Sequence, residues 1–137
     1  MIRKCVVLDT NCLVQIISKH SPFRLVWDAF LRDEYDLCVS NEIIDEYQEI
    51  LEKQTTSRIA EHLIMLLINS GNVKFLNPQY RFNLITSDPD DNKFVDCAIV
   101  GGADFIVSDD AHFAILDKIK FPHVRIKRLS EFFEELK

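Results

Sequence analysis

Short continuous apolar runs alternate along the chain with longer segments in which apolar residues recur every three or four positions. Residues 5–8 and 105–107 are uninterrupted apolar runs, and residues 35–39, 73–76 and 124–126 are strand-like runs that each contain one charged residue. Such runs are typical of strands that are buried on both faces of a sheet. The intervening segments show the periodicity of amphipathic helices. This alternation predicts an α/β fold, a three-layer sandwich around a central, mostly parallel sheet of four to five strands.

Capping residues mark where the predicted helices begin and end. Ser21 before Pro22 predicts an N-cap with proline at the first helical position, and Ser40 and Ser130 predict two further helix starts. A short helix is also expected after the first strand. Further helices are expected around residues 59–67, ending at Gly71, from Asp88-Pro89 to Gly101-Gly102, and near residues 111–118.

The 137 residues form a single predicted domain, residues 1–137, which is long enough to bury a substantial core. The longest apolar run, residues 63–68, is far below the roughly 20 residues that cross a membrane, and no signal peptide precedes the first strand. We therefore expect a cytoplasmic protein with no membrane contact. The four cysteines form no C-x-x-C pair, so buried reduced thiols are expected rather than disulfides or a zinc site.

Charge is distributed unevenly. The net charge is -6, and residues 86–110 alone contain seven aspartates and one lysine, so the remainder of the chain is neutral. An acidic surface repels nucleic acid unless metal ions or a local basic patch compensate. Such a basic patch, with no acid inside it, consists of Lys118, Lys120, Arg125, Lys127 and Arg128. It is either a solvated face or a contact for an RNA backbone.

Two common ligand-binding loops are excluded. The chain has only three glycines and no glycine-rich phosphate loop. The spacing of Asp88, Asp90 and Asn92 resembles the start of a calcium-binding EF-hand, but Lys93 replaces the required glycine and Ile99 replaces the bidentate glutamate.

Acidic residues follow two of the predicted strands. Asp9 comes directly after residues 5–8, and Ser108-Asp109-Asp110 follows residues 105–107. The carboxyl ends of parallel strands meet at one edge of a sheet, where ligand sites gather. One acid at a strand end is often a helix cap, but two at the same edge favour a site.

Two further acids are candidates for the same edge. Glu46 lies at the margin of the apolar face of its helix, next to Ile43 and Ile50, and its alternative role is that of a surface glutamate. Asp88-Pro89-Asp90-Asp91 supplies the other. This segment also has a purely structural explanation. Asp88 can be the N-cap, Pro89 the first helical residue, and Asp90 and Asp91 acids of the first turn that complement the helix dipole.

Carboxylates that cluster repel one another unless cations neutralise them. Oxygen ligands select hard cations such as Mg²⁺ or Mn²⁺. One or two such ions can activate water, orient a phosphodiester and stabilise charge in an in-line displacement.

The chain resembles the PIN-domain nucleases, in particular small bacterial PIN proteins of the VapC type that serve as toxins of toxin–antitoxin systems. The resemblance covers essentially the whole chain. It is based on four segments: Val-Val-Leu-Asp9-Thr-Asn11; Val-Ser40 followed by Glu46-Tyr-Gln-Glu-Ile-Leu; Asp88-Pro-Asp-Asp91-Asn-Lys-Phe94 with Ala98; and Ala103-Asp-Phe-Ile-Val-Ser108-Asp-Asp110.

The resemblance implies a set of site residues. The four catalytic and metal-binding acids would be Asp9, Glu46, Asp91 and Asp110, supported by the polar residues Asn11 and Ser108, and Ser108 replaces the more common threonine. Asp96 is the alternative to Asp91, since the two lie about 140° apart around a helix and cannot both enter one pocket. Asp109 is the alternative to Asp110.

The predicted function is that of a Mg²⁺- or Mn²⁺-dependent endoribonuclease. The resemblance further implies an RNA substrate, a cognate antitoxin protein and a homodimer. A non-catalytic RNA- or protein-binding module with an idle acidic site is the alternative. An aspartyl-phosphate enzyme of the haloacid-dehalogenase type is disfavoured because Asn11 stands where that chemistry requires a second aspartate. The four histidines suggest no catalytic relay. His112, which follows the acidic segment, is expected on a helix surface, with a contact to substrate as the alternative.

Overall fold

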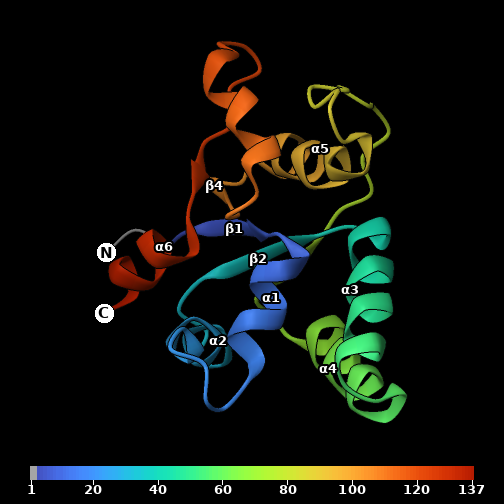
Figure 1. Ribbon diagram of the computed structural model, residues 1–137, viewed down its shortest axis with the longest axis vertical. Coiled ribbons are helices and arrows are strands. Elements are labelled where there is room, and N and C mark those ends of the chain that lie inside the picture. Colours follow the sequence, from blue (N-terminus) through green and yellow to red (C-terminus); the bar gives the residue numbers. More distant parts are fainter. Residues whose placement is uncertain (1–2) are drawn as a thin grey trace.

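The computed structural model describes residues 3–137. The first two residues of the predicted domain, and any prediction for them, lie outside this range. The chain alternates between strands and helices (Figure 1). The elements are β1 Cys5–Leu8, α1 Thr10–Ile17, α2 Arg24–Leu31, β2 Asp36–Val39, α3 Asn41–Gln54, α4 Ser57–Asn69, β3 Val73–Phe75, the 3₁₀ helix η1 Pro89–Asp91, α5 Asn92–Gly101, β4 Phe105–Val107, the 3₁₀ helix η2 Ala111–Lys118, β5 Ile126–Lys127 and α6 Leu129–Leu136.

The strands form one five-stranded sheet in the order β3-β2-β1-β4-β5, and each described pairing is parallel. The predicted α/β fold with a central parallel sheet is therefore confirmed. Strand β1 lies in the centre, with Val7 opposite Ile106 of β4. The chain first builds outward through β2 and β3 and then returns to the other side of β1, so the strand order reverses between β1 and β4. Ligand sites in parallel sheets favour this reversal point.

Helices cover both faces of the sheet. Parallel strands are usually joined by right-handed crossovers. With this strand order, such crossovers put α1 to α4 on one face while the chain moves towards β3, and α5 on the opposite face when the chain returns to β4. Figure 1 shows α5 above the central strands and α1 and α2 below them. Because both faces are covered, residues of β1 and β4 such as Val6, Val7 and Ile106 are completely buried.

Several predicted helix boundaries are confirmed. The Ser40 hydroxyl accepts a hydrogen bond from the Ile43 N–H at 3.3 Å and caps α3. The Asp88 carboxylate accepts the Asp90 N–H at 3.3 Å and begins η1, which leads directly into α5. Gly102, with a φ of 63°, ends α5 in the left-handed conformation that glycine adopts most easily.

Other predicted boundaries are wrong. Helix α2 begins at Arg24, not at Pro22, because the Ser21 hydroxyl accepts the Phe23 N–H at 3.0 Å in a turn that precedes the helix. Helix α6 begins at Leu129 and contains Ser130 rather than following it. The last strand is Ile126–Lys127 rather than residues 124–126. Gly71 directly follows the Ser70 C-cap of α4, in agreement with the prediction that it ends this helix.

Helix α4 buries a narrow face, formed by Ala60, Ile64 and Leu67, and leaves other apolar side chains in solvent. Ile59 and Met65 are each about half exposed. Among residues 3–137, no helix has the length and apolar character needed to span a bilayer.

Candidate active site

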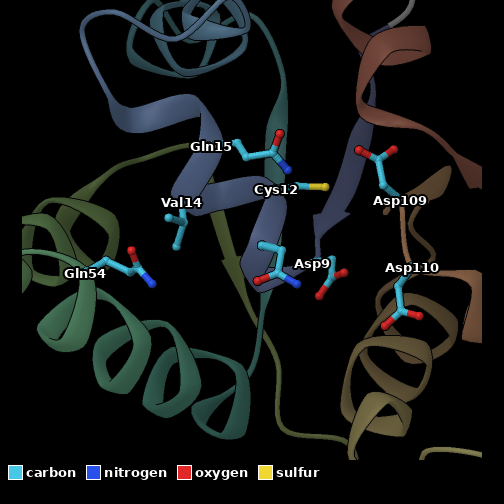
Figure 2. A pocket seen from close by; sticks show the side chains of 8 residues that line it. Asp9, Cys12, Val14, Gln15, Gln54, Asp109 and Asp110 are labelled. Atoms are coloured by element: carbon cyan, nitrogen blue, oxygen red, sulfur yellow. The ribbon is translucent and has the colours of Figure 1, made fainter.

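An open pocket of about 430 Å³ lies at the carboxyl edge of the sheet, between β1 and β4 (Figure 2). Asp9 and Asp110 contribute carboxylates to it, and Figure 2 shows them close to each other on segments that follow β1 and β4. The predicted supporting residue Asn11 also lines this pocket. The remaining lining residues are Cys12, Val14, Gln15, Gln54 and Asp109.

Asp9 joins the ends of the two central strands. Its backbone N–H donates to the Val107 carbonyl at 3.0 Å, and its Oδ2 accepts a hydrogen bond from the Ser108 hydroxyl at 2.8 Å. Burial raises the pKa of Asp9, the Ser108 hydrogen bond lowers it, and the charges of Asp110 and Glu46 raise it further. The three carboxylates are therefore close enough to repel one another.

Asp110 and Asp109 point to different partners. The Asp110 N–H donates to the Ser108 hydroxyl at 3.0 Å, and the Asp110 carboxylate accepts the His112 N–H at 2.8 Å. Asp109 also lines the pocket, but its carboxylate accepts the Leu129 N–H at 3.1 Å at the start of α6. Asp109 is therefore occupied as a helix cap, whereas Asp110 lies with the other acids.

Asp91 and Asp96 occupy different environments on either side of the start of α5. Asp91 lies near Asp88, Asp110 and Asp9, and burial together with these charges raises the pKa of Asp91 to about 7. Asp96 is 97% buried but accepts the N–H of Phe82 at 3.1 Å, away from the acidic group. Of the two alternatives, Asp91 lies near Asp9 and Asp110, although it does not itself line the pocket.

Glu46 is held by two neighbours. One of its oxygens accepts a hydrogen bond from the Thr10 hydroxyl, and the other pairs with the Lys93 ammonium at 2.7 Å. Lys93 is nearly buried and also pairs with Asp90 at 2.9 Å. Glu46 therefore faces the start of α1 and the start of α5, with a fixed cation beside it.

A further group of potential ligands includes residues that the sequence did not single out. One ligand atom each from Asp88, Asp91 and His112 lies within 4.8 Å of the others. Asp88 was assigned only as a helix cap, and His112 was expected on a helix surface. Their spacing offered a weak signal, because Asp88 precedes Asp91 by one helical turn and His112 follows Asp110 by two residues.

The predicted basic patch is not one continuous surface. Lys118, Lys120 and Arg125 are exposed. Lys127 is mostly covered, pairs with Glu135 at 2.5 Å and packs over the Phe105 ring. Arg128 lies 3.6 Å from Asp109. No acid lies between the five residues in the sequence, but acids from other segments fold against Lys127 and Arg128.

A family model of the PIN domain matches residues 5–112. This chain belongs to the PIN-domain family. PIN domains are generally metal-dependent nucleases, and the acidic residues of this member cluster as such a role requires.

Solved structures support the PIN fold. The chain is similar to VapBC2 from Rickettsia felis, with a TM-score of 0.62, 15% identity and coverage of 90% of this chain and 98% of that one. It is similar to VapBC-1 from nontypeable Haemophilus influenzae, with a TM-score of 0.61, 12% identity and coverage of 92% and 98%. It is also similar to the PIN domain of human SMG5, with a TM-score of 0.53, 15% identity and coverage of 97% and 99%. No curated protein sequence gave a significant match.

The residues of this PIN domain fit a divalent cation. Asp91 Oδ2 is buried and has no hydrogen-bond partner among the described residues. An ionised oxygen in that position is costly unless a cation or a donor satisfies it. Asp9 and Asp110 supply further carboxylate oxygens beside it, and such ligands suit Mg²⁺ and Mn²⁺.

Proposed function

We propose that this protein is a Mg²⁺- or Mn²⁺-dependent endoribonuclease, with Asp9, Glu46, Asp91 and Asp110 as its catalytic and metal-binding acids. The observation that carries the proposal is the grouping of Asp9, Asp91 and Asp110 at the point where the strand order reverses. Asp91 Oδ2 lies there buried and without a donor. Burial, and after it the charges of the neighbouring acids, raise the pKa of Asp9 and Asp91, as expected for a site that a cation would neutralise.

The bound ion would supply an activated water and offset the charge that develops on the phosphate during hydrolysis. The chain's own residues orient the acids for this role. The Ser108 hydroxyl donates to the Asp9 carboxylate and accepts the Asp110 N–H, so it fixes that carboxylate and the Asp110 backbone relative to β4. Thr10 and Lys93 hold Glu46 from opposite sides. Asn11 lines the pocket as a polar neighbour.

The proposed substrate is RNA. The exposed residues Lys118, Lys120 and Arg125 lie on the segment that follows Asp110 and can contact a phosphate backbone. Lys127 is engaged with Glu135 and is not included.

The proposed partner is a cognate antitoxin, which would make this chain the toxin of a pair. Among the similar structures are three VapBC complexes, from Rickettsia felis, Haemophilus influenzae and Salmonella typhimurium. They support the proposal through the fold alone. A homodimer is proposed as well, and the apolar residues that α4 leaves exposed are consistent with a protein contact on that side.

The nuclease proposal can be tested by measuring the cleavage of single-stranded RNA by the purified protein in the presence of defined metal ions. The wild-type protein is expected to cleave RNA with Mn²⁺ or Mg²⁺ and to lose that activity with a chelator. Asp9→Asn and Asp91→Asn are each expected to reduce cleavage by about a hundredfold or more, because a cation ligand is lost. Asp96→Asn, within α5, is the matched control, since the asparagine oxygen can still accept the Phe82 N–H.

Circular dichroism of each variant would show that the fold is retained. RNA cleavage that persists in a folded Asp9→Asn protein would contradict the proposal. An inactive Asp96→Asn protein beside an active Asp91→Asn protein would reverse the assignment of the acid on α5. RNA binding without cleavage under every metal condition would favour the non-catalytic alternative.

A further inference from the structure

His112 Nδ1 faces three carboxylates at the acidic edge of the sheet. It lies 3.1 Å from Asp110 Oδ1, 3.6 Å from Asp88 Oδ2 and 3.6 Å from Asp91 Oδ2. These groups come from two segments of the chain, the η1 turn before α5 and the start of η2 after β4. The fold therefore brings an imidazole nitrogen to Asp91 and Asp110, two of the predicted site acids, and to Asp88.

The two longer distances fit joint ligation better than direct hydrogen bonding. Separations of 3.6 Å are beyond the usual range for an N–H···O hydrogen bond. Two ligands of one ion, each about 2.1 Å from it, can lie up to about 4.2 Å apart. The ligand atoms of Asp88, Asp91 and His112 all lie within 4.8 Å of one another, so small side-chain rotations suffice for a shared ion.

Two independent features leave these atoms available. Asp91 Oδ2 is buried and has no hydrogen-bond partner among the described residues. Asp88 uses its other oxygen, Oδ1, to accept the Asp90 N–H, and this bond fixes the carboxylate while Oδ2 faces His112. Asp110 similarly fixes the backbone of His112 by accepting its N–H at 2.8 Å.

We propose that His112, through Nδ1, and Asp88 join Asp91 in holding the divalent ion, which gives this centre a nitrogen ligand and a preference for Mn²⁺ over Mg²⁺. The proposal rests on the metal-dependent function proposed above. Mg²⁺ strongly favours oxygen ligands, whereas imidazole suits first-row transition metals. It requires the tautomer in which Nδ1 is unprotonated and Nε2 carries the hydrogen.

Mn²⁺ alone is the probe for the first experiment. Pulsed electron paramagnetic resonance on the Mn²⁺-loaded wild-type protein is expected to show coupling to a directly bound ¹⁴N nucleus. The coupling is expected to vanish in His112→Ala and to persist in His62→Ala. His62 is the matched control because it is an exposed histidine on α4, outside the acidic group.

Calorimetric titration with Mn²⁺ and with Mg²⁺ tests the selectivity. His112→Ala is expected to weaken Mn²⁺ binding by about tenfold and Mg²⁺ binding by no more than about twofold. Asp88→Asn, which keeps the helix cap, is expected to weaken the binding of both ions because an ionised oxygen ligand is lost.

The outcomes separate this inference from the nuclease proposal. Mn²⁺ bound to the wild-type protein without nitrogen coupling would overturn the role of His112 and leave the carboxylate site intact. An equal loss of Mn²⁺ and Mg²⁺ affinity in His112→Ala would also overturn it, because it would indicate a merely structural or electrostatic role. A wild-type protein that binds neither ion would overturn both proposals.

Discussion

Individual aspartates in this protein are distinguished by their hydrogen-bond partners, not by their residue type. Asp96 and Asp109 are each occupied by a backbone N–H, from Phe82 and Leu129 respectively. Asp91 Oδ2 has no such partner among the described residues and lies beside other carboxylates. At the scale of single residues, this free buried oxygen distinguishes Asp91 from Asp96 and Asp109.

The raised pKa of Asp91 predicts a pH-dependent stability of the metal-free protein. Its pKa is about 7 in the folded state, and about 3.9 is usual in an unfolded chain. Between these values the folded state binds more protons, so its stability falls as the pH rises from about 4 to about 7. In the presence of a chelator, the wild-type Tm is expected to be a few degrees higher near about pH 5 than near about pH 8.

Asp91→Asn should weaken this dependence and raise the Tm near neutral pH, because it removes the charge that burial and its neighbours disfavour. Thermal unfolding across the pH range measures the effect. The exposed Asp117→Asn, on η2, is the control and should follow the wild-type profile. If the Tm of Asp91→Asn depends on pH in the same way as that of the wild type, ionisation of Asp91 does not cause the pH dependence.

Helix α3 connects the acidic edge to the central strand. The Tyr47 hydroxyl donates to the Leu8 carbonyl at 2.5 Å, and both residues are buried. Tyr47 follows Glu46, and Leu8 precedes Asp9. This one hydrogen bond therefore fixes the spacing between two elements that each carry a predicted catalytic acid.

Tyr47→Phe is expected to cost about 1–2 kcal/mol of stability, because a buried carbonyl loses its donor. It should also reduce metal-dependent RNA cleavage, since α3 can then shift relative to β1. Tyr35→Phe is the matched control: the Tyr35 hydroxyl donates to the Val26 carbonyl at 2.9 Å and is equally buried, but it lies outside the acidic group. Urea unfolding and cleavage rates measure both effects. Equal losses of activity in the two variants would show that general destabilisation is the cause.

Helix boundaries show how far local sequence predicts an element. Ser40 and Gly102 were predictable because each cap involves only neighbouring residues. The start of α6 was not, because its first N–H, that of Leu129, is capped by Asp109, twenty residues earlier in the chain. Phe23, at the start of α2, packs against Phe133 of α6 at a ring distance of 5.5 Å. Such contacts between distant segments are invisible in a local pattern.

At the scale of the whole molecule, the fold concentrates negative charge along one edge. Asp88, Asp91 and Asp110 of the acidic segment 86–110 lie there with Asp9, and Glu46 is close enough to raise the pKa of Asp9. The folded state gathers these charges while the unfolded chain disperses them. A cation that binds only the folded state therefore stabilises it.

Mn²⁺ or Mg²⁺ is expected to raise the Tm of the wild-type protein. The gain in stability is about 2.7 kcal/mol when the free ion reaches about a hundred times its Kd. Differential scanning fluorimetry measures the shift, and sodium chloride at matched ionic strength controls for screening. The shift should be much smaller in Asp9→Asn. A shift of equal size with sodium chloride alone would show that general screening, and not a bound ion, stabilises the fold.

The sequence by itself determined the alternation of buried strands and amphipathic helices, and hence the parallel sheet. It also placed Asp9 and Asp110 after two strands whose ends had to meet. These features depend on residue periodicity and strand direction, which act over a few positions. Only the tertiary structure decided the partners of each acid. Asp9 meets Ser108 across 99 residues, Glu46 meets Lys93, and Asp91 meets His112. Such pairings depend on which segments fold beside β1, and packing of the whole chain determines that.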